Sequence, residues 1–429
     1  MGGHRELIVD DRVAKYWSNI ATTAFELGLL VGQVSTSNVG DFVLAVVPVP
    51  SECENGKAPI GISDLSVEWV EQFAQQVDHL LPGGISVLGL YVVSTENISI
   101  QVLLAYLRAT AEAVAIPSSV FAGDDVHLLA LVLPNDEIVF QTFYNVTDVN
   151  KAQMLSAGIK TSTTEIKFKQ YRTLIDLNEA IPFENGSLNA ATTATKMADQ
   201  RMNEVENHLR PLIRRIEDSV AVLGQTSSTE AQYMNLLTPM PNKVHSFTEN
   251  VSIGEQLSWL NSLLGDIRGA ICCVAYVSYF EPKANEVAAE FLKRDFVKSL
   301  LLRVSMVRER WAECNEVESN AVFKKGGVIR LARRGLIPWH SAAMFSRHFS
   351  ATVHVFPDED VEQAVKIALE ILGNNTLNGS SWTALEIGDQ LDLSFNQTSS
   401  SSELMYSIYA YTLLPIALVF ALLFVQYAM

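Results

Sequence analysis

The chain of 429 residues is poor in the side chains on which nucleic-acid-binding and disulfide-bonded proteins depend. It has 31 Lys and Arg against 48 Asp and Glu, a formal net charge of −17. This balance disfavours nucleic acid or anionic lipid as a main partner, because an acidic surface repels both. Its four cysteines show no CxxC or zinc-finger spacing. They are typical of a reducing compartment, not of a disulfide framework.

The motifs of the common enzyme classes are absent as well. There is no GxxxxGK[ST] phosphate loop, no GxSxG elbow, no HExxH and no GxGxxG after a strand. The closest histidines, His340, His348 and His354, lack metal-ligand spacing. We therefore predict a chain that is not an enzyme and needs no cofactor. A metal-independent hydrolase that uses Cys53 or Cys314 stays open as the weakest alternative.

One long uncharged run is present. It begins at Leu404, contains Pro415 and ends at Val425. As a helix it would extend about 33 Å, enough to cross a hydrocarbon core of roughly 30 Å. A proline inside it is tolerated better in a membrane helix than in a soluble one. The run predicts a transmembrane helix in contact with the lipid bilayer; the alternative is a buried helix of a soluble domain.

The position of this run predicts the topology. Four residues follow it, so we expect insertion after translation, as a tail anchor. The N-terminus has no apolar signal segment, so the preceding body is expected in the cytosol and the seven Asn-x-Ser/Thr sequons are expected to be unused. No Lys or Arg lies within the last 60 residues. Mitochondrial anchors usually carry basic flanks, so the membrane of the endoplasmic reticulum is favoured.

Apolar periodicity predicts an α/β domain over residues 7–180. Its expected helices cover residues 11–25, a stretch that begins near Asp64, and 99–115. Its expected strands cover residues 28–34, 42–50, 85–94, 126–134, 137–146 and about 164–177. Residues 181–252 are predicted as a linker that holds an amphipathic helix over 192–224, on which Arg210, Arg214 and Arg215 form a basic spot.

A second, smaller α/β domain is predicted over residues 253–372. Its expected helices cover residues 254–266, 284–313 and 358–372, and its expected strands 269–279, 327–333 and 351–357. Lys324, Lys325, Arg330, Arg333 and Arg334 form the strongest basic cluster of the chain. The last three are candidate partner-binding residues, with ordinary surface charge as the alternative. A polar tether, residues 373–403, joins this domain to the anchor.

The first domain resembles the MPN (JAMM-type) fold in the order of its elements. Active members of that family place a His-x-His pair at the end of the central strand and an Asp ligand further on, because zinc needs three donors and a water. Here Val92 and Ser94 occupy the histidine positions, and the Asp position falls near Ala105. We therefore predict an inactive domain without metal.

Two classes of protein without catalytic activity fit these features. A tail-anchored fusion or vesicle-trafficking factor would need heptad repeats directly before its anchor, and here the polar tether occupies that place. An adaptor or chaperone needs folded binding surfaces, a flexible reach and an anchor, and the sequence predicts all three.

Several stretches together carry a closer resemblance. They are GLLVGQVS, WVEQFAQQVDHLLPGGISVLGLYVVS, GDIRGAICCVAYVSYFEPKANEV and FLKRDFVKSLLLRV, followed by the hydrophobic anchor. The chain resembles the odorant-response-abnormal protein four family, and the opening MGGHRE is similar to a nematode member. The most specific parts are LLPGG before the strand and Lys293-Arg294-Asp295 in the helix.

The resemblance implies a single-pass protein of the endoplasmic reticulum and cytoplasmic vesicles. Members assist seven-helix odorant receptors, in olfaction and chemotaxis, to fold, leave the reticulum and reach the cilium. The resemblance also implies a partner, the protease of the ubiquitin-fold modifier, which the family holds at the membrane. It implies no catalytic residue.

Overall fold

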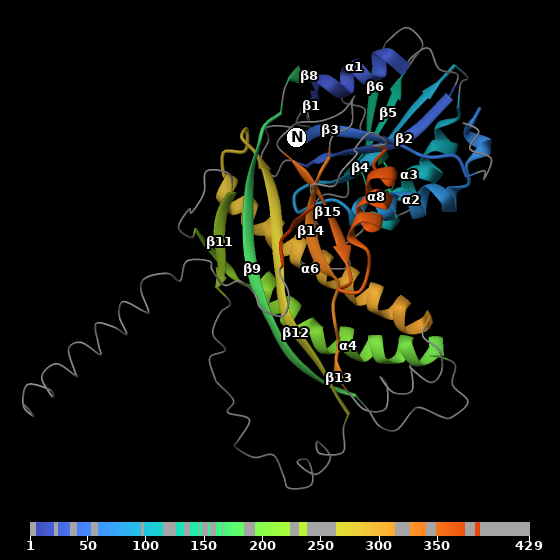
Figure 1. Ribbon diagram of the computed structural model, residues 1–429. Coiled ribbons are helices and arrows are strands. Elements are labelled where there is room, and N and C mark those ends of the chain that lie inside the picture. The colour runs from blue at the N-terminus through green and yellow to red at the C-terminus, as the bar shows by residue number, and fades with distance from the viewer. Residues whose placement is uncertain are drawn as a thin grey trace, which may run out of the picture. The chain divides into compact units, whose positions relative to one another are not determined.

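The computed structural model describes residues 6–20, 25–34, 41–52, 59–95, 98–114, 126–132, 138–144, 146–147, 153–154, 160–164, 166–183, 194–223, 231–237, 263–313, 327–339, 349–373 and 382–386. In this part of the chain, helices pack on three sheets (Figure 1). Met1–Leu385 form one compact unit. The mixed α/β class predicted from the sequence is confirmed.

The first sheet contains strands β1 to β8 in the order β7-β6-β5-β4-β2-β3-β1-β8. They are β1 (Glu6–Asp10), β2 (Phe25–Gln33), β3 (Asp41–Pro48), β4 (Ser86–Ser94), β5 (Val126–Val132), β6 (Ile138–Tyr144), β7 (Gln153–Met154) and β8 (Lys160–Thr164). β2 pairs antiparallel with β3 and β4, whereas β4 and β5 run parallel. The central strands are buried on both faces, which explains their continuous apolar sequence.

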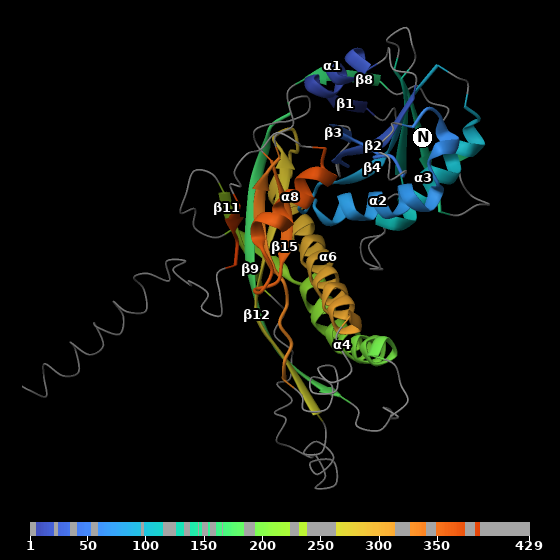
Figure 2. The same cartoon turned by 45° about the vertical axis from the view of Figure 1, so that its right-hand side comes forward.

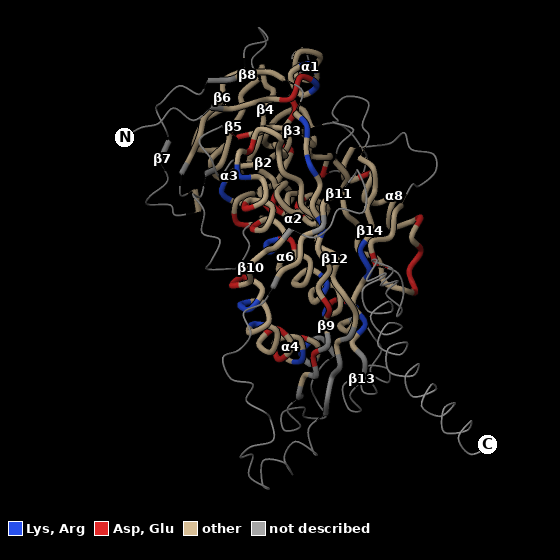
Figure 3. Tube along the Cα trace, turned by 90° about the vertical axis from the view of Figure 1, so that its left-hand side faces the viewer, with Lys and Arg blue, Asp and Glu red and all other residues tan. Residues whose placement is uncertain are grey.

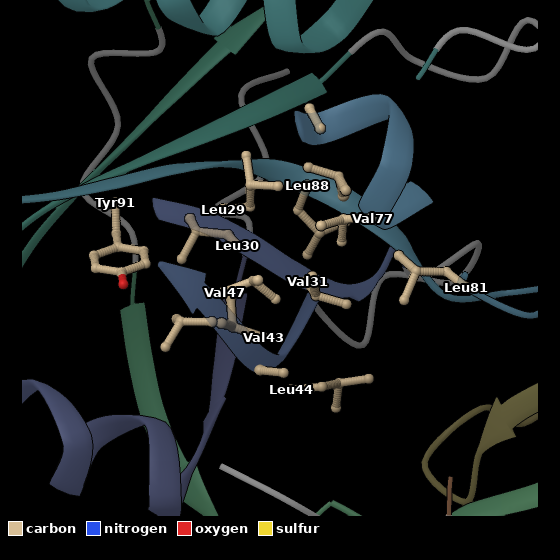
Figure 4. Close-up of a cluster of buried hydrophobic side chains, with 14 of the residues drawn as sticks. Leu29, Leu30, Val31, Val43, Leu44, Val47, Val77, Leu81, Leu88 and Tyr91 are labelled. Carbon is tan, nitrogen blue, oxygen red and sulfur yellow. The ribbon is translucent and has the colours of Figure 1, made fainter. Parts of the chain in front are cut away.

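Helices cover both faces of this sheet. α2 (Val67–His79) and α3 (Ile100–Val114) pack together on one face, and α1 (Asp11–Ile20) lies on the other (Figures 1 and 2). From α1 the fully buried Trp17 contacts the Tyr91 ring. Leu88, three residues earlier on β4, lies with Val77 of α2 in the cluster that Figure 4 shows. Side chains of β4 point alternately to the two faces of the sheet, so this strand packs against α1 on one face and against α2 on the other.

The start of α2 differs from the expected one. Ser66 is the N-cap residue, and its Oγ accepts a hydrogen bond from the Trp69 amide at 3.1 Å. Asp64, predicted as the cap, lies in a preceding 3₁₀ turn (Ile62–Asp64) and accepts from the Ile60 amide at 2.8 Å. Both side chains can cap a helix, and the intervening turn decides between them.

The second sheet has the order β10-β11-β9-β12-β13. Its strands are β9 (Phe168–Phe183), β10 (Val220–Leu223), β11 (Ala231–Leu237), β12 (Leu263–Ser278) and β13 (Gly327–Val328). β9 and β12 pair antiparallel over their whole length, as two long curved ribbons in Figures 1 and 2. α4 (Ala194–Glu217) and α6 (Ala284–Glu313) pack against each other and against this pair of strands.

A third, small sheet holds β14 (Arg333–Pro338) between β15 (Ser350–Val355) and β16 (Thr383–Ala384). α8 (Val361–Ile371) follows β15 and is capped by Asp360, whose side chain accepts from the Glu362 amide at 3.0 Å. Leu336 and Ile337 of β14 join the core of the first sheet, while Phe356 joins the core of the second.

Several predictions for single elements need correction. The helix expected over residues 192–224 ends at Glu217, and residues 220–223 form strand β10. Residues 263–266 of the helix expected over 254–266 lie in strand β12. The strand expected near residues 164–177 is β9, which belongs to the second sheet and crosses the boundary placed at residue 180. Residues 225–250, predicted as linker, contain β11. Only residues 327–328 of the strand expected at 327–333 form β13, and β14 begins at Arg333, where that strand was expected to end. β1 was not expected before the first helix. The domain boundaries themselves stay predictions.

The predicted anchor lies outside the described residues. Leu404, Pro415 and Val425 all belong to that part of the chain, as does most of the tether. Among the helices that the structure describes, none is both long and apolar enough to cross a membrane.

Candidate functional site

The LLPGG segment lies against the second sheet. After α2 ends, the Gly83 amide donates to the Val274 carbonyl at 2.8 Å. The Tyr276 amide in turn donates to the Gly83 carbonyl at 2.9 Å. These two bonds make a parallel bridge between Gly83 and Ala275 of β12. Gly83, in the loop between α2 and β4, therefore pairs with β12 as a one-residue parallel bridge.

This approach needs residues without a side chain. A Cβ on Gly83 would lie 2.7 Å from the Phe291 carbonyl oxygen and 2.9 Å from that of Val274. Gly84 has a φ of 80°, a conformation that L side chains rarely adopt, and its Cβ would meet the Tyr276 carbonyl oxygen at 2.5 Å. The two glycines of LLPGG are thus explained by close contact with β12 and α6.

Gln33, at the end of β2, joins the same backbone segments. Its Nε2 donates to the carbonyls of Gly84 and Tyr276, at 2.9 and 2.7 Å. Its Oε1 accepts from the Ser278 amide at 3.0 Å. Gln33 is 2% exposed, so one buried side-chain amide satisfies three backbone groups, and its bonds to Tyr276 and Ser278 are fully buried.

Replacing Gln33 with leucine is expected to lower the free energy of unfolding by about 1–3 kcal/mol, because buried backbone groups lose their partners. Thermal unfolding of the full chain in detergent, followed by circular dichroism, measures the loss. Gln75→Leu on the exposed face of α2 is the matched control, with an expected change within about 0.5 kcal/mol. Equal effects of the two replacements would contradict the role of Gln33.

A buried ion pair lies behind the LLPGG segment. Asp295 of α6 and Arg334 of β14 are 1% and 2% exposed, and two bonds of 2.5 and 2.8 Å join them. Asp295 also accepts from the Val274 amide at 2.8 Å. Arg334 donates further to Thr352 of β15 at 3.4 Å. The Thr352 amide donates to the Leu80 carbonyl at 2.8 Å, which connects all three sheets.

The rest of Lys293-Arg294-Asp295 also faces inward. Lys293 is 7% exposed, and its Nζ donates to the Glu217 carbonyl at the end of α4 at 2.9 Å. Burial lowers the pKa of Arg294. LLPGG and Asp295 of the second motif therefore meet in one polar joint between the sheets, whereas Lys293 reaches the end of α4.

Further polar contacts lie on the side of this joint towards α2. Lys298 pairs with Asp78 at 2.8 Å and donates to the Leu81 carbonyl at 3.4 Å. The hydroxyl of Ser299 lies 3.0 Å from Nε2 of His354. These side chains hold α6 to the end of α2 and to β15.

Acidification is expected to loosen the joint. Burial, helped by Arg303, Arg334, His79 and Lys298, holds the pKa of His354 well below its ordinary value of 6.5. At a pH between the lowered pKa of His354 in the folded chain and its ordinary pKa in the unfolded chain, this histidine binds a proton only when the chain is unfolded. Stability then falls as the pH drops below 6.5, by at most about 1.4 kcal/mol per pH unit for this group.

Unfolding in guanidinium between pH 7 and pH 5 measures this slope. His354→Gln keeps a hydrogen-bonding side chain beside Ser299 but does not titrate, so it should flatten the slope. Burial also lowers the pKa of His79, so a smaller slope is expected to persist in the variant. An unchanged slope in His354→Gln would contradict the assignment to this residue.

The predicted zinc-ligand positions do not converge on a site. Val92 is 3% exposed in the interior, Ser94 is half-buried at the end of β4, and Ala105 is exposed on α3. Valine and alanine offer no lone pair to zinc. Among the described residues there is no group of three His, Cys, Asp or Glu side chains able to hold a metal ion.

The basic cluster does not form one surface. Arg330 is exposed and Arg333 is half-buried, but Arg334 is the buried partner of Asp295. The expectation that Arg334 belongs to a partner-binding surface is therefore corrected. Arg334 lies in the buried part of β14, where its guanidinium pairs with the interior carboxylate of Asp295. Lys324 and Lys325 lie outside the described residues.

Sequence reasoning missed Gln33 and Asp78 altogether. Each is a single polar residue beside apolar ones, and no local pattern reveals a partner 243 residues away, as for Gln33 and Tyr276. The available signal was indirect. LLPGG and Lys293-Arg294-Asp295 were the most specific parts of the family resemblance, but their contact in space was not predictable.

Comparisons with known proteins agree with the resemblance. The model of the family described as "Odorant response abnormal 4-like" matches residues 28–381. The human protein named "Protein odr-4 homolog" is 25% identical over 71% of this chain and 70% of its own. Its chicken namesake is 24% identical over 71% of both chains, and that of Xenopus laevis 24% identical over 86% and 83%.

A solved structure, the crystal structure of UfSP from C. elegans, aligns with 86% of this chain and 56% of its own. Its sequence identity is 10% and its TM-score is 0.38. The family match covers both motifs of the polar joint, LLPGG and Lys293-Arg294-Asp295. By that match, the chain belongs to the ODR4-like family.

Proposed function

We propose that this chain is a membrane-anchored adaptor or chaperone without catalytic activity. In this role it assists seven-helix odorant receptors to fold, to leave the endoplasmic reticulum and to reach the cilium. It also recruits the protease of the ubiquitin-fold modifier to the membrane. The match of residues 28–381 to the ODR4-like family is the observation that carries the proposal.

The polar joint supports a scaffolding role. Its charges are paired with one another, as in Asp295 with Arg334 and Asp78 with Lys298. Such paired groups hold the sheets that they connect in a fixed relative placement. The proposal therefore assigns the body to binding.

The proposal includes an inactive MPN-like origin for the first sheet. The apolar strand β4, with Val92 and Ser94 near its end, supports this reading. An inactive domain suits a protein that holds a protease without sharing its chemistry.

The proposal also includes a single membrane helix that begins at Leu404 and ends at Val425. Its length, its lack of charge and its tyrosines near both ends support this reading. The body would then lie in the cytosol, and residues 373–403 would give it lateral reach towards receptors.

Arginine substitution tests the anchor. The double variant Leu418→Arg and Phe420→Arg is expected to move the protein out of the membrane fraction, because each central arginine costs about 2.5–3.5 kcal/mol. Fractionation of cells with an alkaline wash measures the distribution. Leu391→Arg and Leu393→Arg in the tether are the control, with no expected change. A double variant that stays in the membrane would contradict the anchor.

Affinity purification from detergent-solubilised membranes tests the adaptor. The full chain and a version that ends at Ser402 should both bring down the modifier protease, and only the full chain should place it on membranes. Surface delivery of a tagged odorant receptor in the same cells should depend on the full chain. Absence of the protease from both purifications would overturn the recruitment role, and unchanged delivery would overturn the receptor role.

A further inference from the structure

The second sheet ends in a strand whose outer face is apolar and open. β10 stands at the end of the order, and among the described strands it pairs only with β11. Val220 is 65% exposed and Val222 is 45% exposed. Ala221, between them, packs against the core. Two valines two residues apart therefore share one solvent-facing side of an edge strand.

The edge of this sheet has few of the usual protections against added strands. Natural edges are often blocked by lysine, proline or an inward charge, and the sequence of β10 is Val-Ala-Val-Leu. Its short length is the one protective feature that it retains. An uncharged edge with alternating exposed valines is the kind of template to which an extended peptide adds a strand.

The edge is also held in place. The turn from α4 to β10 is fixed by the Ser219 hydroxyl, which donates to the Ile216 carbonyl at 2.6 Å, and by Lys293, which donates to the Glu217 carbonyl. Ser219 is 4% exposed. A rigid strand binds at a lower entropic cost than one that must first be ordered.

Positive charge lies next to this edge in an otherwise acidic protein. Arg210 and Arg214 are exposed, one helical turn apart, on the last two turns of α4. Arg215 is 53% exposed and only loosely held by Glu179, at 3.3 Å. Figure 3 shows basic positions where α4 runs into β10, with acidic positions interspersed. Asp218, between α4 and β10, is exposed.

We propose that β10 and the basic end of α4 form a docking surface for an extended, acidic peptide segment of a partner protein. The segment adds a strand to β10, places apolar side chains on Val220 and Val222, and turns carboxylates towards Arg210 and Arg214. Main-chain bonds supply affinity, and the charges supply selection for acidic sequences. This surface is independent of membrane attachment and of the receptor role.

A binding experiment with defined peptides tests the surface. The probe is a short fluorescent peptide that alternates valine with aspartate, and the protein is the full chain in phosphatidylcholine nanodiscs. Fluorescence anisotropy should show binding that weakens with salt. The double variant Arg210→Glu and Arg214→Glu should weaken it about tenfold or more. Lys196→Glu with Lys366→Glu is the control, because it makes the same charge change away from β10.

Strand addition has its own readout. N-methyl groups on one alternate set of peptide amides should abolish binding, and methyl groups on the other set should leave it, because only one set faces β10. Val222→Asp should also abolish binding while thermal unfolding shows that the protein is folded.

Three outcomes would overturn the proposal. The first is that the acidic peptide binds no better than one in which asparagine replaces aspartate. The second is a dimer of the full chain that Val222→Asp dissolves, because a second copy would then cover the edge. The third is binding of phosphatidylserine vesicles that requires Arg210 and Arg214, because the basic end would then face lipid.

Discussion

Replacing Asp295 with alanine is expected to lower the free energy of unfolding by about 3–5 kcal/mol, because it leaves the Arg334 guanidinium charged and unpaired in the interior. The carboxylate also accepts from the Val274 amide, which loses its partner in the variant. Guanidinium unfolding of the full chain in detergent, followed by tryptophan fluorescence, measures the change.

A surface ion pair supplies the control for this prediction. The side chains of Lys283, directly before α6, and Glu286, in its first turn, lie 3.0 Å apart and are 68% and 73% exposed. Removing Lys283 should change stability by less than about 1 kcal/mol, because water screens such pairs. A loss for Asp295→Ala no larger than that for Lys283→Ala would contradict the placement of Asp295 and Arg334 in the interior.

Replacing Gly84 with alanine is expected to cost about 2–5 kcal/mol, from a strained backbone and from overpacking together. The new Cβ would lie 2.4 Å from the Phe291 ring and 2.5 Å from the Tyr276 carbonyl oxygen. The loop should then separate from β12. Amide hydrogen exchange at Tyr276, which donates to the Gly83 carbonyl, should accelerate before the rest of the sheet exchanges.

Gly61→Ala is the matched control for this change. Gly61 has an extended backbone with a φ of −157°, and its Cβ would meet only the Ser63 hydroxyl, at 4.0 Å. Stability within about 0.5 kcal/mol of the parent protein is expected. If exchange at Tyr276 is the same in Gly84→Ala and in Gly61→Ala, the bridge between the loop and β12 does not exist.

Much of the secondary structure could be predicted because apolar periodicity is local. The helix expected over residues 284–313 is α6 with the same bounds, and the strand expected at 85–94 is β4, displaced by one residue at its start. The pairing of strands was not predictable in this way. β9 follows β8 in the chain but pairs with β12, which comes much later in the sequence. The alternation of apolar residues along a strand does not identify the strand with which it pairs.

The polar joint was predictable only in part. LLPGG and Lys293-Arg294-Asp295 were the most specific parts of the family resemblance, which singled them out without showing what they contact. Arg334 was misassigned because a basic residue near other basic residues usually lies on the surface. Its burial follows from the position of Asp295 across 39 residues of chain, which no local pattern reveals.

A repaired joint tests the central claim that this body is a scaffold without chemistry. The double variant Asp295→Asn and Arg334→Met removes both charges and keeps an acceptor for the Val274 amide, so it should recover much of the stability lost in Asp295→Ala. Delivery of a tagged odorant receptor to the cell surface is then compared among parent, single and double variants. The account predicts that delivery follows stability and returns in the double variant. Restored stability without restored delivery would contradict it, because the buried charges would then act in the function itself.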